Sequence, residues 1–288
     1  MSGRLQMIIL ALLLSAGIAS PPLTARQAEP DSVGLALVEE KTAADNATGE
    51  EKLPPPLRIV KNNAFREGEK LSYVIRYGPI LAGYSSLSIP EVVEVNGHPA
   101  YHIISEAWSN KFFSRFYKVQ DRVESFTDVR GIFSWKFEKH LREGSYRADQ
   151  YVVYDQKNRL AYTEKDTMEI PLYVQDVLSA MYYVRTLTFE PGDTLYVDNH
   201  ADGKVYPLAV IIHKRERIKV KAGKFDCIVV EPVLKTSGVF KQKGRLVVHF
   251  TDDERKIPVL MTSQIYVKAF SLGSVVAELE KIEGVPGY

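Results

Sequence analysis

The chain has 288 residues, of which 45% are hydrophobic and 25% are charged, and this composition is ordinary for a globular protein. The formal net charge of +1 gives no general argument for nucleic-acid binding, which requires clustered cations. Because Cys227 is the only cysteine, an internal disulfide is excluded, and the fold must be stabilised by a buried core, which this length allows.

The first 25 residues have the pattern of a secretory signal peptide. A polar lead with one cation, Arg4, precedes an uncharged apolar run over residues 7–18, and small residues and two prolines follow it. The run is shorter than the roughly 20 residues of a membrane-spanning helix. We therefore expect an exported, soluble protein of the periplasm or the extracellular space, with no transmembrane segment after signal removal. A lipoprotein is not expected, because the cysteine lies far from the cleavage region.

Residues 26–56 differ in composition from the rest of the chain. They contain seven acidic and three basic residues, no aromatic residue, and a proline run at their end. Low hydrophobicity and excess charge favour disorder, and consecutive prolines stiffen a chain. We expect a disordered acidic and proline-rich tether over 26–56 and a single β-rich domain over 57–288.

The pattern of the remaining chain predicts many strands. In residues 71–77, large apolar side chains occupy every second position, which is typical of a strand with two unlike faces. Turn signals such as Asn96-Gly97 and Asp202-Gly203 favour antiparallel hairpins. The aromatic segment 111–117 is expected to be a helical turn or the start of a strand. Further strands are expected at about 80–89, 100–109, 117–128, 132–141, 145–154, 159–164, 194–200, 204–213, 216–221, 226–236, 244–252, 257–268 and 273–282.

Residues 175–187 predict one amphipathic helix. Val177, Met181 and Val184 follow at i, i+4 and i+7, on one apolar stripe, and Asp176 is suited to cap the helix. Asp176 and Arg185 lie about 180° apart around such a helix, so each must bond elsewhere if it is buried. A large antiparallel sheet that buries one face around one helix predicts a curved half-barrel, similar in shape to lipocalins and lipoprotein carriers.

A basic stretch is the first candidate for ligand binding. In an extended chain, Arg215, Arg217, Lys219 and Lys221 share one face, and such a line of cations suits an anionic headgroup, a glycan or a phosphate. The alternative is an exposed strand whose lysines discourage edge pairing.

Met181, Tyr182 and Tyr183 of the expected helix are the second candidate. A methionine and two tyrosines under a curved sheet suit the lining of an apolar pocket. The alternative is ordinary packing of the apolar stripe against the sheet.

The sequence contains no recognisable catalytic motif. It has neither a G-x-S-x-G nucleophile elbow nor a glycine-rich phosphate loop, and its six histidines lack metal-ligand spacing, so we predict no catalytic residue, metal or cofactor. Asp121 and Glu124 are three residues apart and would face opposite sides of a strand. Asp252 and Asp253 suit a solvated turn. Cys227 lies in an apolar run, which indicates a buried core residue.

Several phrases, taken in order and spacing, resemble one bacterial family over about residues 62–282. They are FREGEKLSY (65–73), YGPI (77–80), AG (82–83), QDVLS (175–179), YYVR (182–185), AGKFDC (222–227), VEP (230–232) and DDERKIPV (252–259). The chain resembles the family known as domain of unknown function 3108 (DUF3108). The resemblance implies an exported envelope protein and supplies no catalytic residues.

Three hypotheses follow from these patterns. The leading one is a non-enzymatic binding or envelope-maintenance protein that holds an apolar or amphipathic ligand or a glycan. The second is an envelope hydrolase or glycan-processing enzyme that uses Asp121, Glu124 or Asp253 with His140. The third is an interaction module in which the tether spans distance while the domain docks on an envelope protein. The expected partners are a lipid, a glycan or an envelope protein, and not nucleic acid, while the oligomeric state stays open.

Overall fold

The computed structural model describes residues 58–234, 244–267 and 270–288, so the predicted signal peptide and tether lie outside the described residues. The described residues form fifteen strands in one sheet, the α-helix α2 and the short 3-10 helix η1. The helices are α2 (Val177–Thr186) and η1 (Phe113–Arg115), and the strands are β1 (Lys70–Tyr77), β2 (Ile80–Ser88), β3 (Val92–Val95), β4 (His98–Ser109), β5 (Gln120–Asp128), β6 (Ser134–Glu143), β7 (Tyr146–Asp155), β8 (Leu160–Thr163), β9 (Thr167–Glu169), β10 (Thr194–Ala201), β11 (Lys204–Val220), β12 (Gly223–Leu234), β13 (Gly244–Thr251), β14 (Pro258–Val267) and β15 (Phe270–Glu283).

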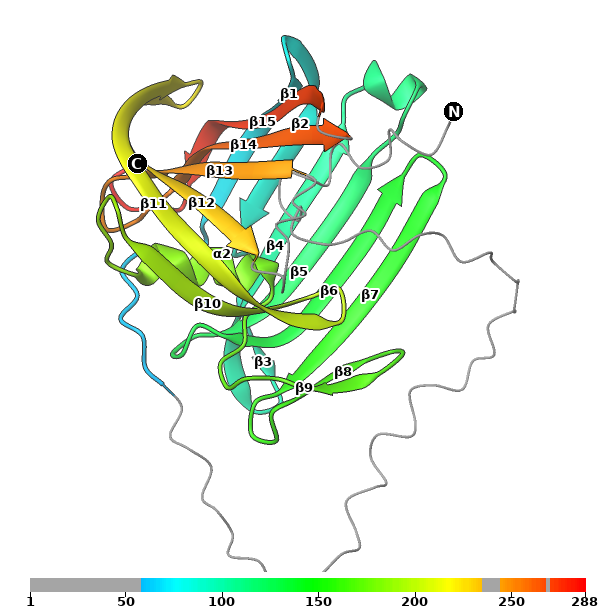
Figure 1. Ribbon diagram of the computed structural model, residues 1–288, viewed down its shortest axis with the longest axis vertical. Coiled ribbons are helices and arrows are strands. Elements are labelled where there is room, and N and C mark those ends of the chain that lie inside the picture. Colours follow the sequence, from blue (N-terminus) through cyan, green and yellow to red (C-terminus); the bar gives the residue numbers. More distant parts are fainter. Residues whose placement is uncertain (1–57, 235–243, 268–269) are drawn as a thin grey trace, which may run out of the picture. The chain divides into compact units, whose positions relative to one another are not determined.

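The sheet consists of two antiparallel meanders that meet in its middle. The strand order is β10-β11-β12-β13-β14-β15-β1-β2-β4-β5-β6-β7-β8-β9, and β3 pairs with β4 beside this path. At the centre, β15 pairs with β1 from Glu283 opposite Lys70 to Val275 opposite Tyr77. Figure 1 shows the sheet curving around α2. The prediction of a mainly β fold with a large curved antiparallel sheet and one helix is therefore confirmed.

The start of α2 is fixed by a buried cap. Asp176 Oδ1 accepts hydrogen bonds from the backbone N–H groups of Leu178 and Ser179, at 2.8 and 2.9 Å. Its Oδ2 accepts from Ser125 Oγ at 2.6 Å and Ser134 Oγ at 2.7 Å. Burial raises the pKa of Asp176, and these donors limit the rise. The cap thus satisfies the first turn of the helix and ties it to β5 and β6.

The segment just before α2 is bonded to both meanders. Ser134 N of β6 donates to Val174 O at 3.2 Å, Gln175 N donates to Asp198 O at 2.9 Å, and His200 N of β10 donates to Gln175 O at 2.7 Å. The chain that enters the helix therefore links β6 with β10, which lie far apart in the strand order.

The end of α2 is held by a buried ion pair. Arg185 Nη1 and Nη2 donate to the two carboxylate oxygens of Glu69, at 2.7 and 2.8 Å. Arg185 also donates to Ala64 O and Arg255 O, at 3.2 and 3.1 Å. Burial disfavours the charged guanidinium, but the Glu69 carboxylate compensates, so the pKa of Arg185 lies above its ordinary value. As expected from the helix geometry, Asp176 and Arg185 each find partners outside the helix.

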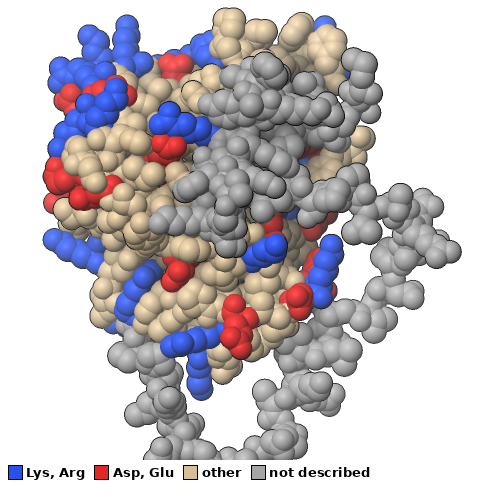
Figure 2. Space-filling view, in the orientation of Figure 1, with Lys and Arg blue, Asp and Glu red and all other residues tan. Residues whose placement is uncertain are grey.

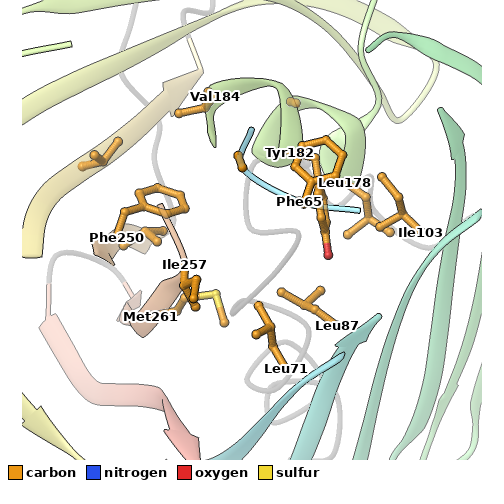
Figure 3. Close-up of a cluster of buried hydrophobic side chains, with 14 of the residues drawn as sticks. Phe65, Leu71, Leu87, Ile103, Leu178, Tyr182, Val184, Phe250, Ile257 and Met261 are labelled. Atoms are coloured by element: carbon orange, nitrogen blue, oxygen red, sulfur yellow. The ribbon is translucent and has the colours of Figure 1, made fainter. Parts of the chain in front are cut away.

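The inner side of the helix is packed with apolar side chains. Tyr182 is fully buried, and its ring meets that of Phe65 edge-on at 4.8 Å between centroids. Figure 3 shows Leu178, Tyr182 and Val184 of α2 above side chains from both meanders. The labelled sheet residues of this core include Leu71, Leu87, Ile103, Phe250 and Met261. Cys227 is also buried and free, as its apolar surroundings predict.

Beyond shifts of a few residues at strand ends, the set of strands differs from the prediction at three places. The short strands β3 and β9 pair with β4 and β8 and were not predicted. The predicted strands 204–213 and 216–221 form one continuous strand, β11, whose register with β12 shifts between Ile212 and Arg215. A bulge accommodates the polar pair at 213–214 without ending the strand. The Asn96-Gly97 turn is confirmed, with φ of 52° and 79°, as a two-residue hairpin.

Candidate functional site

The candidate residues of α2 lie in unlike environments. The Tyr182 hydroxyl donates to Glu69 Oε1 at 3.3 Å, and its side chain is enclosed by protein atoms. Met181 and Tyr183 are partly buried against the core. The Arg58 guanidinium lies 4.3 Å from the centre of the Tyr183 ring. Ligand contact by Met181, Tyr182 and Tyr183 stays a prediction.

The candidate cations of the basic stretch lie on β11 and the turn after it, and most of them are paired. Figure 2 shows basic and acidic atoms side by side at the upper left, where β11 and β12 lie in Figure 1. Lys219 is exposed. The other cations have carboxylate partners at 2.7–2.8 Å: Arg215 with Glu190 and Asp252, Arg217 with Asp226, and Lys221 with Glu280. The positive charge of this stretch is thus largely compensated, and a role in ligand binding stays a prediction.

The candidate acids do not meet in one place. Asp121 lies on the same face of β5 as Ser125, toward the helix, and Glu124 lies on the opposite face. Asp253 organises a turn, because its Oδ1 accepts from the backbone N–H groups of Arg255 and Lys256 and its Oδ2 accepts from Tyr288. The second hypothesis therefore retains only Glu124 beside His140.

Glu124, Glu138 and His140 do form a cluster on the outer face of β5 and β6. One ligand atom from each lies within 4.8 Å of the others. These groups already have partners: Glu124 accepts from Arg122 and binds His102, Glu138 pairs with Lys136, and His140 Nδ1 lies 2.7 Å from Asp149. Because a cation would have to displace these contacts, we interpret the cluster as a network of ion pairs and hydrogen bonds.

Large aromatic side chains are exposed where β4 meets β5 and where β6 meets β7, near the upper right of Figure 1. Phe112 and Phe116 are 60% and 76% exposed, and their ring centroids lie 5.5 Å apart. Trp108 and Tyr146 beside them are also exposed. The two connections touch, since Gly144 N donates to Lys118 O at 2.7 Å. We call residues 110–118 together with 144–147 the aromatic tip.

Four exposed cations belong to the aromatic tip: Lys111, Arg115, Lys118 and Arg147. Among the described residues, none of their charged nitrogens lies within 4.0 Å of a carboxylate oxygen. By contrast, Arg215 and Arg217 of β11 each have a carboxylate partner. The tip therefore combines apolar surface with uncompensated positive charge.

The loop of the aromatic tip is held firmly by its polar residues. Asn110 Nδ2 donates to Leu81 O at 2.6 Å, and Asn110 Oδ1 accepts from Phe113 N at 2.8 Å. Ser114 Oγ donates to Asn110 O at 2.7 Å, and Tyr117 OH donates to Glu143 at 3.3 Å. The polar side chains and Tyr117 thus turn toward the sheet, which leaves Phe112 and Phe116 directed outward.

A groove of about 720 Å³ lies at the base of the aromatic tip. The register places Glu106 opposite Arg122 and Arg122 opposite His140, so these groups share one side of the sheet. Most of the charged groups that line the groove are basic. They include Lys118, Arg122, Arg142 and Arg147, with Trp108 and His140.

A buried carboxyl pair, Asp121 and Glu143, lies beside the groove, and Asp121 is one of the residues that line it. Asp121 Oδ1 accepts from Arg142 N at 2.8 Å, and Glu143 Oε2 accepts from Tyr117 OH. Burial, and then the neighbouring Asp121 carboxyl, raises the pKa of Glu143 to about 8, and burial also raises the pKa of Asp121. Ionisation of one of these carboxyls therefore disfavours ionisation of the other.

From the sequence, segment 111–117 was expected to be a helical turn or the start of a strand, and no functional role was predicted for it. Its helical turn is confirmed as η1. The prediction missed the phenylalanines that lie among Lys111 and Arg115 between two strands. Apolar side chains at the end of a hairpin lie outside the core, so this pattern indicates an exposed aromatic surface.

Among the described residues, no helix has the length and hydropathy needed to cross a membrane.

Three solved structures share part of this architecture at low identity. A β-barrel-like DUF1849 protein from Brucella abortus gives a TM-score of 0.48 at 11% identity, over 79% of this chain and 98% of that one. A candidate lipoprotein from Parabacteroides distasonis gives 0.34 at 11% identity, over 78% and 99%. A candidate exported protein with a YmcC-like fold from Bacteroides fragilis gives 0.28 at 14% identity, over 78% and 99%.

At the level of sequence, no curated protein matches the chain. The model of one family, described as a protein of unknown function (DUF3108), matches residues 72–280. This range contains β2 to β14, α2 and Arg185, and it covers most of the chain. The chain belongs to the DUF3108 family.

Proposed function

We propose that the chain is a non-enzymatic binding protein of the bacterial envelope and that its groove binds the anionic headgroup of an amphipathic molecule. The observation that carries the proposal is the groove of about 720 Å³ lined by basic side chains at the base of an exposed aromatic tip. The location in the envelope is supported by the signal-peptide pattern of residues 1–25.

The chemistry of the groove favours a phosphate or a similar anion. Lys118 and Arg147 have exposed charges without carboxylate partners among the described residues, and guanidinium and ammonium groups are the usual partners of phosphate. The volume falls within the range of small-molecule sites, roughly 300–1,000 Å³. Trp108 in the groove and Phe116 nearby on the tip offer apolar surface to the rest of an amphiphile.

The other two hypotheses receive less support. Of the acids expected for a hydrolase, only Glu124 lies beside His140, and its oxygens are occupied by Arg122 and His102. The interaction module depends on residues 26–56, which lie outside the described residues.

The test is titration calorimetry with dihexanoyl phosphatidylglycerol, kept below its micellar concentration, against the zwitterionic dihexanoyl phosphatidylcholine. The double variant Lys118→Ala/Arg147→Ala should weaken binding of the anionic probe at least tenfold, because two charge-assisted contacts are lost. The matched control is Lys157→Ala/Lys165→Ala, which removes two exposed cations of the β7–β8 and β8–β9 connections and should change affinity less than twofold. Equal affinity for both probes, or equal loss in both double variants, would refute the proposal.

A further inference from the structure

We propose that the aromatic tip docks the protein on the surface of an anionic lipid bilayer, with Phe112 and Phe116 inserted at the level of the headgroups. The inference goes beyond the proposed function, because its partner is the bilayer surface and because Phe112 and Phe116, which enter that surface, do not line the groove. It holds whether or not the groove takes a ligand.

The first argument is the exposure of the two phenyl rings. Phe112 and Phe116 are among the largest apolar side chains left in water by this chain, at 60% and 76% exposed. They lie in contact with each other, on η1 and its flanks, rather than scattered over the surface. Single exposed apolar residues are ordinary, but a contiguous aromatic pair at the end of a hairpin is typical of an interaction surface.

The second argument is the charge around these rings. Lys111 and Arg115 flank Phe112 and Phe116 in sequence, are exposed, and have no carboxylate partner among the described residues. By contrast, exposed cations such as Arg217 on β11 are paired with acids. Apolar rings with adjacent free cations match an anionic bilayer, where the rings enter the interface and the cations meet lipid phosphates.

The third argument is the position of Trp108 and Tyr146. Trp108 lies two residues before the first segment of the tip and Tyr146 lies within the second, and they are 41% and 45% exposed. Indole and phenol side chains concentrate at membrane interfaces, where one end of the ring is apolar and the other is polar. Trp108 and Tyr146 therefore add aromatic side chains of the interfacial kind to the two exposed phenylalanines.

The size of the apolar patch favours a bilayer over a folded protein partner. Two phenylalanines bury at most about 500 Å², whereas a stable protein interface buries about 800 Å² on each side. A bilayer needs no complementary pocket, because its interface deforms around inserted side chains. The hydrogen bonds of Asn110 and Ser114 hold the loop in shape before binding, so little ordering is needed on docking.

The test is flotation with vesicles of phosphatidylcholine alone or with 30% phosphatidylglycerol. Every protein is purified in the form that the same host produces, so the N-terminal region is the same in all samples. The wild-type protein should float with the anionic vesicles and much less with the zwitterionic ones. The variant Phe112→Ser/Phe116→Ser should lower the partition coefficient at least tenfold, with an unchanged circular dichroism spectrum, because both rings are exposed.

The variant Lys111→Ala/Arg115→Ala separates the charge from the apolar contribution. It should lower the partition coefficient about 30-fold at 50 mM salt and less than threefold at 500 mM salt, because screening removes the attraction. The matched controls are Ile80→Ser/Tyr162→Ser and Lys157→Ala/Lys165→Ala, which remove exposed apolar or basic side chains elsewhere and should change the partition coefficient less than twofold.

The inference is overturned if the wild-type protein does not float with anionic vesicles or if the tip variants behave like their controls. It is also overturned if Phe112→Ser/Phe116→Ser instead dissolves an oligomer of this chain, which would make the tip a self-association surface. Failure of vesicle binding with intact binding of soluble phosphatidylglycerol refutes the docking and leaves the groove proposal standing. The reverse result refutes the groove proposal alone.

Discussion

The buried ion pair between Glu69 and Arg185 should contribute far more to stability than any ion pair on the surface. The exposed fractions of the two side chains are 1% and 0%. Removal of one partner leaves the other charge, or its hydrogen-bonding groups, without compensation inside the core. We expect Glu69→Gln and Arg185→Met each to lower the free energy of unfolding by about 3–5 kcal/mol.

The double variant Glu69→Gln/Arg185→Met tests whether the two groups act together. If the single losses added, the double variant would lose about 6–10 kcal/mol, which approaches the whole stability of an ordinary domain. Because the pair is one unit, we expect the double variant to lose about as much as one single variant, with a coupling energy of about 3 kcal/mol.

Arg217 and Asp226 provide a matched control. They form the same two-point contact, with both N–O distances at 2.7 Å, but their side chains are 71% and 63% exposed. Solvent screens this pair, so Arg217→Met should cost much less stability than Arg185→Met.

The assay is equilibrium urea denaturation at pH 7 and 25 °C, followed by tryptophan fluorescence and circular dichroism. If fluorescence and circular dichroism give coincident transitions, a two-state treatment is valid. If the variants share the same slope of unfolding free energy against urea concentration, a shift of the midpoint reports a change in stability alone. The reasoning is refuted if Arg185→Met costs no more than Arg217→Met. Additive losses in the double variant would refute the claim that the pair acts as one unit.

Two further predictions follow from buried ionisable groups. The pKa of Glu143 is about 8 in the folded protein, so the native state holds a proton that the unfolded state releases near pH 4.5, and stability should fall by about 4 kcal/mol as the pH rises from 4.5 to 8. Urea titrations at pH 5, 6.5 and 8 should show a weaker fall for Glu143→Gln, and parallel pH profiles would contradict this. Burial raises the pKa of the Cys227 thiol to about 12, so its reaction with Ellman's reagent at pH 8 should be at least 100-fold slower in the folded protein than in urea, and a fast native reaction would contradict the buried site.

The local patterns of the sequence predicted the elements well. Alternation of apolar residues located β1, and the stripe of Val177, Met181 and Val184 located α2, because each reflects the geometry of one element. The strands β3 and β9 were not predicted, because with four and three residues they are too short to show the alternation of apolar and polar residues. The break within β11 was misread because a bulge continues a strand through residues that look like a turn.

The candidate site was harder to predict, since it depends on contacts between distant residues. Glu69 and Arg185 are 116 residues apart, and only the unpaired position of Arg185 on the helix indicated a partner elsewhere. The compensation of Arg215 by Asp252 likewise could not be read from the basic stretch itself. The exposure of Phe112 and Phe116 follows from the reversal of the chain between β4 and β5, which the aromatic composition alone does not show.

The central place of β15 has a consequence for how this sheet is completed. The strand is synthesised after every other described strand, yet it lies between β14 and β1 in the sheet. Until β15 arrives, β1 and β14 each present an unpaired edge, and the two meanders have no common strand. Such distant pairing slows folding and leaves the nascent chain open to edge-to-edge association. A protein truncated before β15 should therefore aggregate rather than lose one peripheral strand.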